Sequence, residues 1–330
     1  MRFVVNATAA WSFPRAWWLF LAWIVTGVCV CSAQQMPPQG AARPAIPAGL
    51  GYYANAHPYL EEPVKRLIKH IPELSSLRAA SNQELLPIIL MHAGMRTKEF
   101  FDDVVDLAAR EQVSQQILTL KGAPIEGRQV QYDYLILVNR REAPPRYEEY
   151  RADGEGKRAD QDGLEEGYAI TAGFALKCIY FLPAMHEDST FRYLGDEMFG
   201  LRDTYVVAFA QRPTQTGFWG TVTGAWGTVR ILDQGIAWID KNTFQILRLR
   251  TDLLAAHSEI GLARQTTEIV FAAVEIPDVA KPLWLPNEVR VDADFQGHTF
   301  RNEHHYSDYR RFRVSVKMGL PETEETPDHQ

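Results

Sequence analysis

The histidines and carboxylates near the C-terminus are the residues whose types could support metal binding or hydrolysis. Glu303, His304 and His305 are consecutive in a segment that reads as a β-strand. Neighbouring residues of a strand point to opposite faces, so His304 and His305 are not expected to bind one metal ion together. Zinc needs three or four ligands, and the sequence offers Glu303 and His305 no further partner at a suitable spacing. We therefore predict a salt-bridged polar face here, and no metal site.

Asp292 and Asp294 lie two residues apart on the polar side of another predicted strand, a spacing that could place two carboxylates on one surface for acid–base chemistry. Arg290 alternates with them, which favours an ion-paired charge ladder instead. The sequence contains no G-x-S-x-G, no P-loop and no dinucleotide-binding glycine pattern. We predict no catalytic residue and no cofactor. A hydrolase using Glu303/His305 or Asp292/Asp294 is kept as an alternative.

The segments that would position these side chains alternate apolar and polar residues with a period of two from residue 129 onward. In 288–295 the valines, Ala293 and Phe295 face one side and the charged residues face the other. Gln296-Gly297 follows as a two-residue hairpin turn. Leu247 and Leu249 are likewise expected to share a face. Predicted strands are 130–138, 146–151, 168–182, 190–194, 204–211, 220–231, 235–240, 244–251, 265–276, 287–295, 298–307 and 311–317.

Residues 57–120 show helical spacing instead. Leu60, Val64, Leu67 and Ile71 form one stripe that Pro72 ends, while Pro87 either kinks or starts the next helix and Gly94 is a candidate C-terminal cap. Strands that follow one another without intervening helices favour an antiparallel sheet. A sheet of ten or more strands must curl, split or close. The fold class is therefore predicted as α+β, with an N-terminal helical segment packed on a large curved antiparallel sheet, half-barrel-like.

The N-terminus has the pattern of a secretory signal peptide: Arg2 and Arg15, an apolar stretch over 17–30, and small residues Ser32 and Ala33. The apolar stretch is shorter than the roughly 18 to 20 residues needed to span a bilayer, although an uncleaved anchor is an alternative. Cleavage after Ala33 leaves Cys178 as the one cysteine, expected to be buried and inert, and changes the formal charge from −7 to −9. This negative charge argues against nucleic acid as a partner.

The predicted organisation has five parts. They are a signal peptide (1–33), a flexible linker (34–56), a helical segment (57–120), an antiparallel half-barrel-like domain (121–318) and a disordered acidic tail (319–330).

Several segments of the predicted sheet occur in a familiar order: 191–195, 204–209, G-I-A-W-I-D at 235–240, 247–249, and L-W-L-P at 283–286. Over residues 125–316 this order resembles the LolA/LolB-like periplasmic lipoprotein-carrier fold, and also uncharacterised secreted bacterial proteins. The resemblance implies an incomplete barrel, lidded by helices, whose concave face holds acyl chains. The helical segment is longer than such a carrier needs, and no ligand-contacting residue is transferred.

These observations predict an exported cell-envelope binding protein, periplasmic or extracellular, that holds an acyl chain, a lipidated protein or another apolar ligand between sheet and helices. Trp219 and Trp226 lie in a Gly-rich segment that is read either as a gate or as ordinary rim packing. The predicted ligand-binding residues are Trp238, Phe244, Leu247, Leu249, Val289, Val291, Phe295, Phe300, Trp219 and Trp226.

The alternative is a non-enzymatic interaction module with a solid core. It would dock an acidic envelope partner through an arginine face. That face consists of Arg248, Arg250, Arg301, Arg310, Arg311 and Arg313.

Overall fold

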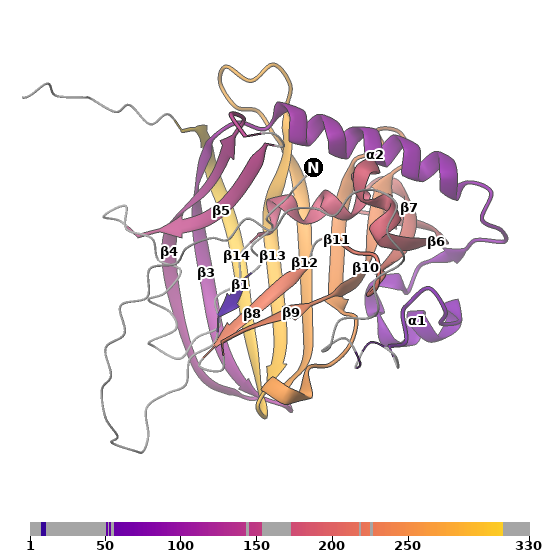
Figure 1. The fold of residues 1–330 in the computed structure, drawn as a ribbon, viewed down its shortest axis with the longest axis horizontal. Coiled ribbons are helices and arrows are strands. Elements are labelled where there is room, and N and C mark those ends of the chain that lie inside the picture. The colour runs from indigo at the N-terminus through magenta and orange to yellow at the C-terminus, as the bar shows by residue number, and fades with distance from the viewer. Residues whose placement is uncertain are drawn as a thin grey trace, which may run out of the picture.

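An eleven-stranded antiparallel sheet dominates the computed structural model, which describes residues 8–10, 51, 53, 56–142, 145–153, 173–217, 219–224 and 227–312. The strand order is β2-β6-β7-β10-β11-β12-β13-β14-β3-β4-β5, so β2 and β5 are the two edges and the sheet is unclosed. Figure 1 shows the strands curving from β5 on one side to β6 on the other, with α2 lying across one end. The predicted fold class is confirmed.

The strands of the large sheet are β2 (Arg78–Ala79), β3 (Leu107–Thr119), β4 (Pro124–Asn139), β5 (Arg146–Ala152), β6 (Ser189–Phe199), β7 (Arg202–Gln211), β10 (Asp233–Asp240), β11 (Ile246–Leu253), β12 (Leu262–Val274), β13 (Leu283–Phe295) and β14 (His298–Arg311). A small sheet contains β1 (Thr8–Ala10), which is parallel to β8 (Gly220–Gly224), and β9 (Gly227–Ile231). The helices are α1 (Val64–His70), α2 (Leu86–Asp103) and the 3₁₀ turns η2 (Pro72–Leu74), η3 (Ala175–Phe181), η4 (Pro183–Asp188) and η5 (Ser258–Ile260).

The two faces of the large sheet carry different covers. On the face that we call the inner face, Leu249, Ile269 and Val289 pack with residues of α2 and η3 in the largest apolar cluster. On the opposite, outer face, Trp238 and Ile236 pack against Leu67 of α1. Alternating side chains of the same strands therefore supply two separate cores, as a sheet covered on both faces requires.

The hairpin predicted at Gln296-Gly297 is confirmed. Both residues have positive φ, 47° and 87°, and Phe295 pairs with His298. This is the left-handed backbone that a two-residue turn demands. The long strands β13 and β14 consequently place their charged residues opposite one another on the outer face.

The predicted helical segment 57–120 is wrong at its C-terminal end, because residues 107–119 form β3 in the middle of the sheet, between β14 and β4. The boundary drawn at residue 120 therefore does not separate helices from sheet. Glu111 and Gln115 lie in this strand at buried positions, each hydrogen-bonded to an arginine. These buried polar residues hide the apolar alternation by which a strand is recognised.

The predicted strand 168–182 is also wrong where it is described, since Ala175–Phe181 is the 3₁₀ helix η3. All seven of its residues are buried. A short, continuously apolar run has no polar side to reveal its period, so a buried strand and a buried helix read alike.

The predicted prolines mark helix boundaries in the structure, whereas the predicted glycine cap does not. Pro72 ends the stripe after α1 and begins η2, and Pro87 lies in the first turn of α2 and starts it. Gly94 is not a cap but lies inside α2, where an added Cβ would be 3.0 Å from Pro183 Cγ. None of the described helices meets the length and apolarity that a membrane crossing requires. Most of the predicted signal peptide and all of the acidic tail lie outside the described residues.

Candidate functional site

The space between the inner face and α2 is occupied by the chain itself. Residues of η3 fill it, and their attachment is polar as well as apolar: Lys177 Nζ lies 2.7 Å from Asp233 Oδ2, and the Tyr180 hydroxyl donates to the same carboxylate oxygen at 2.5 Å. At the start of η3 the backbone N–H groups of Ala175 and Leu176 donate to the Glu149 carboxylate. Within the described residues, η3 therefore occupies part of the space between helices and sheet that was predicted to hold a ligand.

A residual space of about 20 Å³ remains between α2, η3 and strands β11–β13. That volume suits a single water molecule. Cys178 contributes to its wall, together with Thr97 and Phe271. Burial raises the pKa of the Cys178 thiol, so the free, buried cysteine is protonated and matches the predicted inert thiol.

A larger cleft lies beside this space, and we call it the α2 groove. It measures about 280 Å³ and shares Arg96, Phe100, Gln245 and Trp284 with the residual space. Phe100 and Leu283 of its lining are buried, whereas Arg96, Asp103 and Lys281 are exposed and form its mouth. The lining residues are Arg96, Glu99, Phe100, Asp103, Gln245, Ala273, Lys281, Pro282, Leu283 and Trp284.

The mouth of the α2 groove is partly fixed by Arg96. Its Nε donates to the Thr243 carbonyl at 3.0 Å and its Nη1 to Glu99 at 2.7 Å. Thr243 belongs to the β10–β11 turn, where Asp240 Oδ1 accepts the N–H groups of Asn242 and Thr243. Arg96 thus ties α2 to the hairpin that the sequence motif identifies, and holds the groove open on one side.

The ten predicted ligand-binding residues do not meet at one place. Leu249, Val289 and Val291 lie in the inner core, whereas Trp238 lies in the outer one, with its Nε1 donating to Glu197 at 2.7 Å. A third cluster contains Phe295, with Phe300 packed against it, and a fourth has Trp219 at its margin, where the Arg230 guanidinium is 3.8 Å from the ring centroid.

Phe244 and Leu247 are close in sequence to Gln245, which lines the α2 groove, but they do not line it themselves. The Phe244 ring contacts the His92 ring in a tilted arrangement, with 4.6 Å between the ring centroids, and Leu247 is buried. Trp226 lies outside the described residues. A ligand-binding role for these ten residues stays a prediction.

A β-bulge explains why Leu247 does not share the inner face with Leu249, as the alternating pattern predicted. Trp238 pairs with Arg248 and Ile239 with Ile246, so Leu247 is the extra residue on β11. Ile246, and not Leu247, joins Leu249 in the inner core. A one-residue bulge is invisible in an alternating pattern and changes which residues share a face. Of the groove residues, Trp284 carried a usable signal, since it belongs to the L-W-L-P segment.

The inner face also holds a buried polar network. Arg151 donates from two nitrogens to Glu111, to Oε1 at 2.6 Å. His304 Nδ1 lies 2.8 Å, and the Tyr306 hydroxyl 2.6 Å, from the same Glu111 oxygen. Burial opposes ionisation of Glu111, but Arg151 and the hydrogen bond from His304 outweigh it and lower its pKa to about 2. Glu111 is therefore ionised, and its carboxylate contacts Arg151, His304 and Tyr306.

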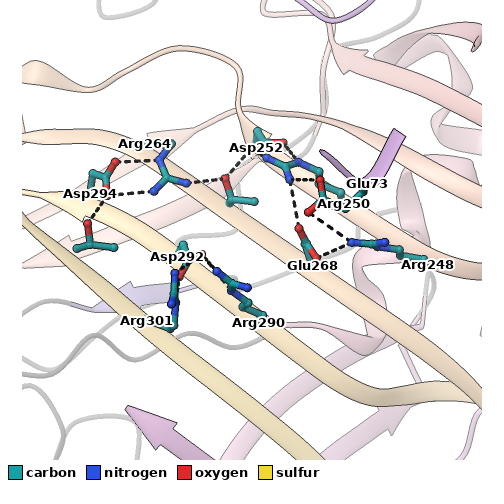
Figure 2. Close-up of polar contacts among 12 residues, drawn as sticks. Glu73, Arg248, Arg250, Asp252, Arg264, Glu268, Arg290, Asp292, Asp294 and Arg301 are labelled. Carbon is teal, nitrogen blue, oxygen red and sulfur yellow. Dashed lines mark hydrogen bonds and ion pairs between the residues drawn. The ribbon is translucent and has the colours of Figure 1, made fainter. Parts of the chain in front are cut away.

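The predicted arginine face is a self-neutralised ladder on the outer face of β11–β14 (Figure 2). Arg250 contacts Asp252, Glu268 and Glu73, and Arg248 contacts Glu268 and Glu73. These arginines, with Arg301, are paired with the chain's own carboxylates, so this part of the face does not present free cations to an acidic partner. Arg310 lies 3.8 Å from Asp133, and Arg313 lies outside the described residues.

The carboxylates considered for hydrolysis belong to the same ladder. Asp292 is held between Arg290 and Arg301, and Asp294 binds Arg264 and Thr299. The charge-ladder prediction for this strand is confirmed. Glu303 lies opposite Arg290 in the register of β13 and β14. Among the described residues no cluster of three His, Cys, Asp or Glu side chains is arranged to hold a metal ion.

Comparison with known proteins returns no matching family model and no matching curated protein. Solved structures similar to this chain include a putative outer membrane lipoprotein-sorting protein domain from Vibrio parahaemolyticus, with 14% identity, 69% of this chain and 94% of that one covered, and a TM-score of 0.36. A DUF1329 family protein from Desulfovibrio piger has 13% identity over 70% and 94% of the two chains and a TM-score of 0.34. The Mycobacterium tuberculosis lipoprotein LppX has 8% identity over 70% and 99%, and a TM-score of 0.22.

All three similarities have TM-scores below 0.5, so they carry no argument about this chain. At such identities and TM-scores they say nothing about the ligand. The chain itself is an unclosed antiparallel sheet with helical covers.

Proposed function

We propose that this protein is a non-enzymatic binding protein of the cell envelope that holds an apolar or acylated ligand in the α2 groove. The observation that carries the proposal is that the groove lies next to the space beside Cys178, with Phe100 and Trp284 lining both. An acyl chain laid on this floor would be stabilised by about 0.8 kcal/mol for each buried methylene. Arg96 and Lys281 are exposed at the mouth, where the polar end of the ligand would contact them and the surrounding water.

A ligand of ordinary size needs slightly more room, since small-molecule sites measure roughly 300–1,000 Å³. The helix η3, which covers the inner face beside the groove, could provide this extra volume by moving. η3 is a seven-residue 3₁₀ helix, longer than such helices usually run, and its hydrogen-bond geometry is poorer than that of an α-helix. Displacement of η3 away from β11–β13 would extend the α2 groove inward along Cys178.

The groove-filling variant Ala273→Trp tests the site. We expect it to weaken binding of a dansyl-labelled undecanoic acid at least tenfold, measured by fluorescence titration. Leu201→Trp introduces the same side chain at a position that is 99% exposed and is the matched control. Equal binding by both variants would place the ligand elsewhere, and no binding by the parent protein would contradict the proposed function.

Cys178 provides an internal reporter for displacement of η3. In protein that lacks Cys29 and Cys31, we expect the acyl probe to increase the rate of maleimide labelling at Cys178 several-fold. An unchanged rate, with the probe bound, would mean that the ligand stays at the mouth of the groove.

The envelope location rests on the predicted signal peptide. N-terminal sequencing of the protein from fractionated host cells is expected to begin at Gln34 and to find it outside the cytoplasm. A chain that begins at Met1 in the membrane fraction would favour the uncleaved anchor instead.

A solid-core interaction module is a second candidate, and one observation favours it. Leu85, just before α2, and Ile88, Met91 and Met95 within it are 42–52% exposed, at helical spacing. Affinity capture with the parent and with an Ile88→Glu/Met91→Glu variant would test this: a partner retained by the parent and lost by the variant, with no acyl-probe binding by either, supports the module.

A further inference from the structure

A second groove lies where the end of β4, the start of β3 and the end of β14 meet, and we call it the arginine groove. It measures about 560 Å³ and is distinct in its lining from the α2 groove. Three arginines and three apolar residues face it, with Asp106 as its one carboxylate. Figure 1 shows these strand ends close to the C-terminal end of α2.

Arg140 is held in place by the helix. One of its guanidinium nitrogens donates to the Asp102 carbonyl at 2.8 Å and to the Val104 carbonyl at 2.6 Å. These carbonyls lie at the C-terminus of α2, where a helix presents partial negative charge and unsatisfied acceptors. The position of this cation is therefore set before any ligand arrives.

Arg141 and Arg311 are different, because both are exposed and neither forms an ion pair with a carboxylate among the described residues. Every labelled arginine of the outer ladder has such a partner (Figure 2). Asp106 is already engaged, since its Oδ1 accepts the N–H of Val138 at 2.7 Å. The lining carries three cationic side chains against one carboxylate, in a chain whose formal charge is −7.

The three apolar residues of the arginine groove are anchored to two apolar clusters. Val105 and Val138 pack against the inner core, and Phe312 packs against the cluster of Ala108, Leu135 and Ala152. The Phe312 N–H donates to the Asp106 carbonyl at 2.8 Å, which ties the end of β14 to the start of β3. A groove lined by apolar residues as well as guanidinium groups can contact both parts of an amphiphile, whereas a bare ion would use only the guanidinium groups.

We infer that the arginine groove is an anion-binding site for an amphiphile, with Arg141 and Arg311 binding a phosphate or carboxylate group while the apolar part lies on Val105, Val138 and Phe312. Guanidinium groups bind such anions through paired, charge-assisted hydrogen bonds. The inference does not depend on the proposed function, because no residue of this groove lines the α2 groove.

Calorimetric titration with n-decyl phosphate below its micellar concentration tests the inference, with inorganic phosphate and the neutral n-decyl maltoside as the two comparison ligands. We expect n-decyl phosphate to bind at least tenfold more tightly than either. Arg141→Gln/Arg311→Gln should weaken that binding at least tenfold. Arg66→Gln/Arg78→Gln removes the same charge from two other exposed arginines and should change it less than twofold.

Three results would overturn the inference. Decyl maltoside binding as tightly as decyl phosphate would mean that the anion is not recognised, and inorganic phosphate binding as tightly would mean that the apolar residues of the groove contribute nothing. Decyl phosphate binding that is lost in Ala273→Trp and retained in Arg141→Gln/Arg311→Gln would locate the ligand in the α2 groove. Decyl phosphate binding lost only in the arginine variant, without undecanoic acid binding by the parent protein, would support this site and refute the proposed function.

Discussion

The two faces of one sheet pair the same residue types under opposite conditions. On the inner face Arg151 and Glu111 have side-chain exposures of 3% and 0%. On the outer face Arg290 and Asp292 have exposures of 48% and 11%. Both are arginine–carboxylate pairs, but the inner pair is shielded from solvent whereas the arginine of the outer pair is solvent-exposed. We therefore expect the burial of an ion pair, and not the number of ion pairs, to decide how strongly its loss lowers the free energy of unfolding.

The energies follow from solvation. An exposed ion pair contributes typically 0.2 to 1 kcal/mol, since water and salt screen it. A buried pair adds little net stability over apolar residues, but removal of one partner costs about 3–5 kcal/mol because the other charge is left uncompensated. Glu111 also accepts hydrogen bonds from His304 and Tyr306, so its loss would leave several polar groups unsatisfied.

Arg151→Met should produce the largest effect. It leaves Glu111 buried without its cation, and we expect the free energy of unfolding to fall by about 3–5 kcal/mol, measured by urea denaturation. The outer-face Arg290→Met is the matched control. Comparable losses in the two variants would show that burial does not distinguish the two faces.

The same network predicts a pH dependence. The pKa of Glu111 is about 2 in the folded protein, against an ordinary value of 4.5. A lowered folded-state pKa contributes stability that is present above pH 4.5 and is lost as the pH falls from 4.5 towards 2, by about 3 kcal/mol in total. Stability measured between pH 6 and pH 3 should therefore decline less steeply in Glu111→Gln than in the parent. Parallel curves would argue that other carboxylates cause the acid sensitivity.

Arg250→Gln should have an intermediate effect, because Arg250 is 11% exposed and contacts Asp252, Glu268 and Glu73. We expect a loss of about 1–2 kcal/mol in the free energy of unfolding. The loss should shrink in 0.5 M NaCl if the outer ladder is screened as exposed pairs are. A salt-independent loss would instead assign Arg250 to the buried class.

Arg290→Gln should have the smallest effect, below about 0.5 kcal/mol. Asp292 keeps its contact with Arg301, at 2.7 Å, when Arg290 is removed. Thermal unfolding of this variant and of Arg301→Gln would sharpen the comparison. A loss above 2 kcal/mol in either would mean that Asp292 behaves as a buried carboxylate.

Local signals predicted the parts of the fold that short segments specify. The Gln296-Gly297 turn and the alternation in β13 depend on backbone preferences within a few residues, whereas Pro87 left two alternatives open that only the structure decided. Those signals failed at β3, where the buried Glu111 and Gln115 replace apolar residues, and at η3, which is apolar on every side. Leu247 shows the limit for the candidate site, because a single bulge moved Ile246 into the core in its place.

The amino-acid sequence alone determined the antiparallel class, the approximate strands and the charge alternation, because these depend on residue spacing within a single strand. Only the tertiary structure decided that η3 fills the inner face, that the arginine ladder neutralises itself and that Arg141 and Arg311 are left without carboxylate partners among the described residues. The reason is physical: whether a side chain is buried, paired or free depends on residues from strands far apart in sequence, whose register no local pattern encodes.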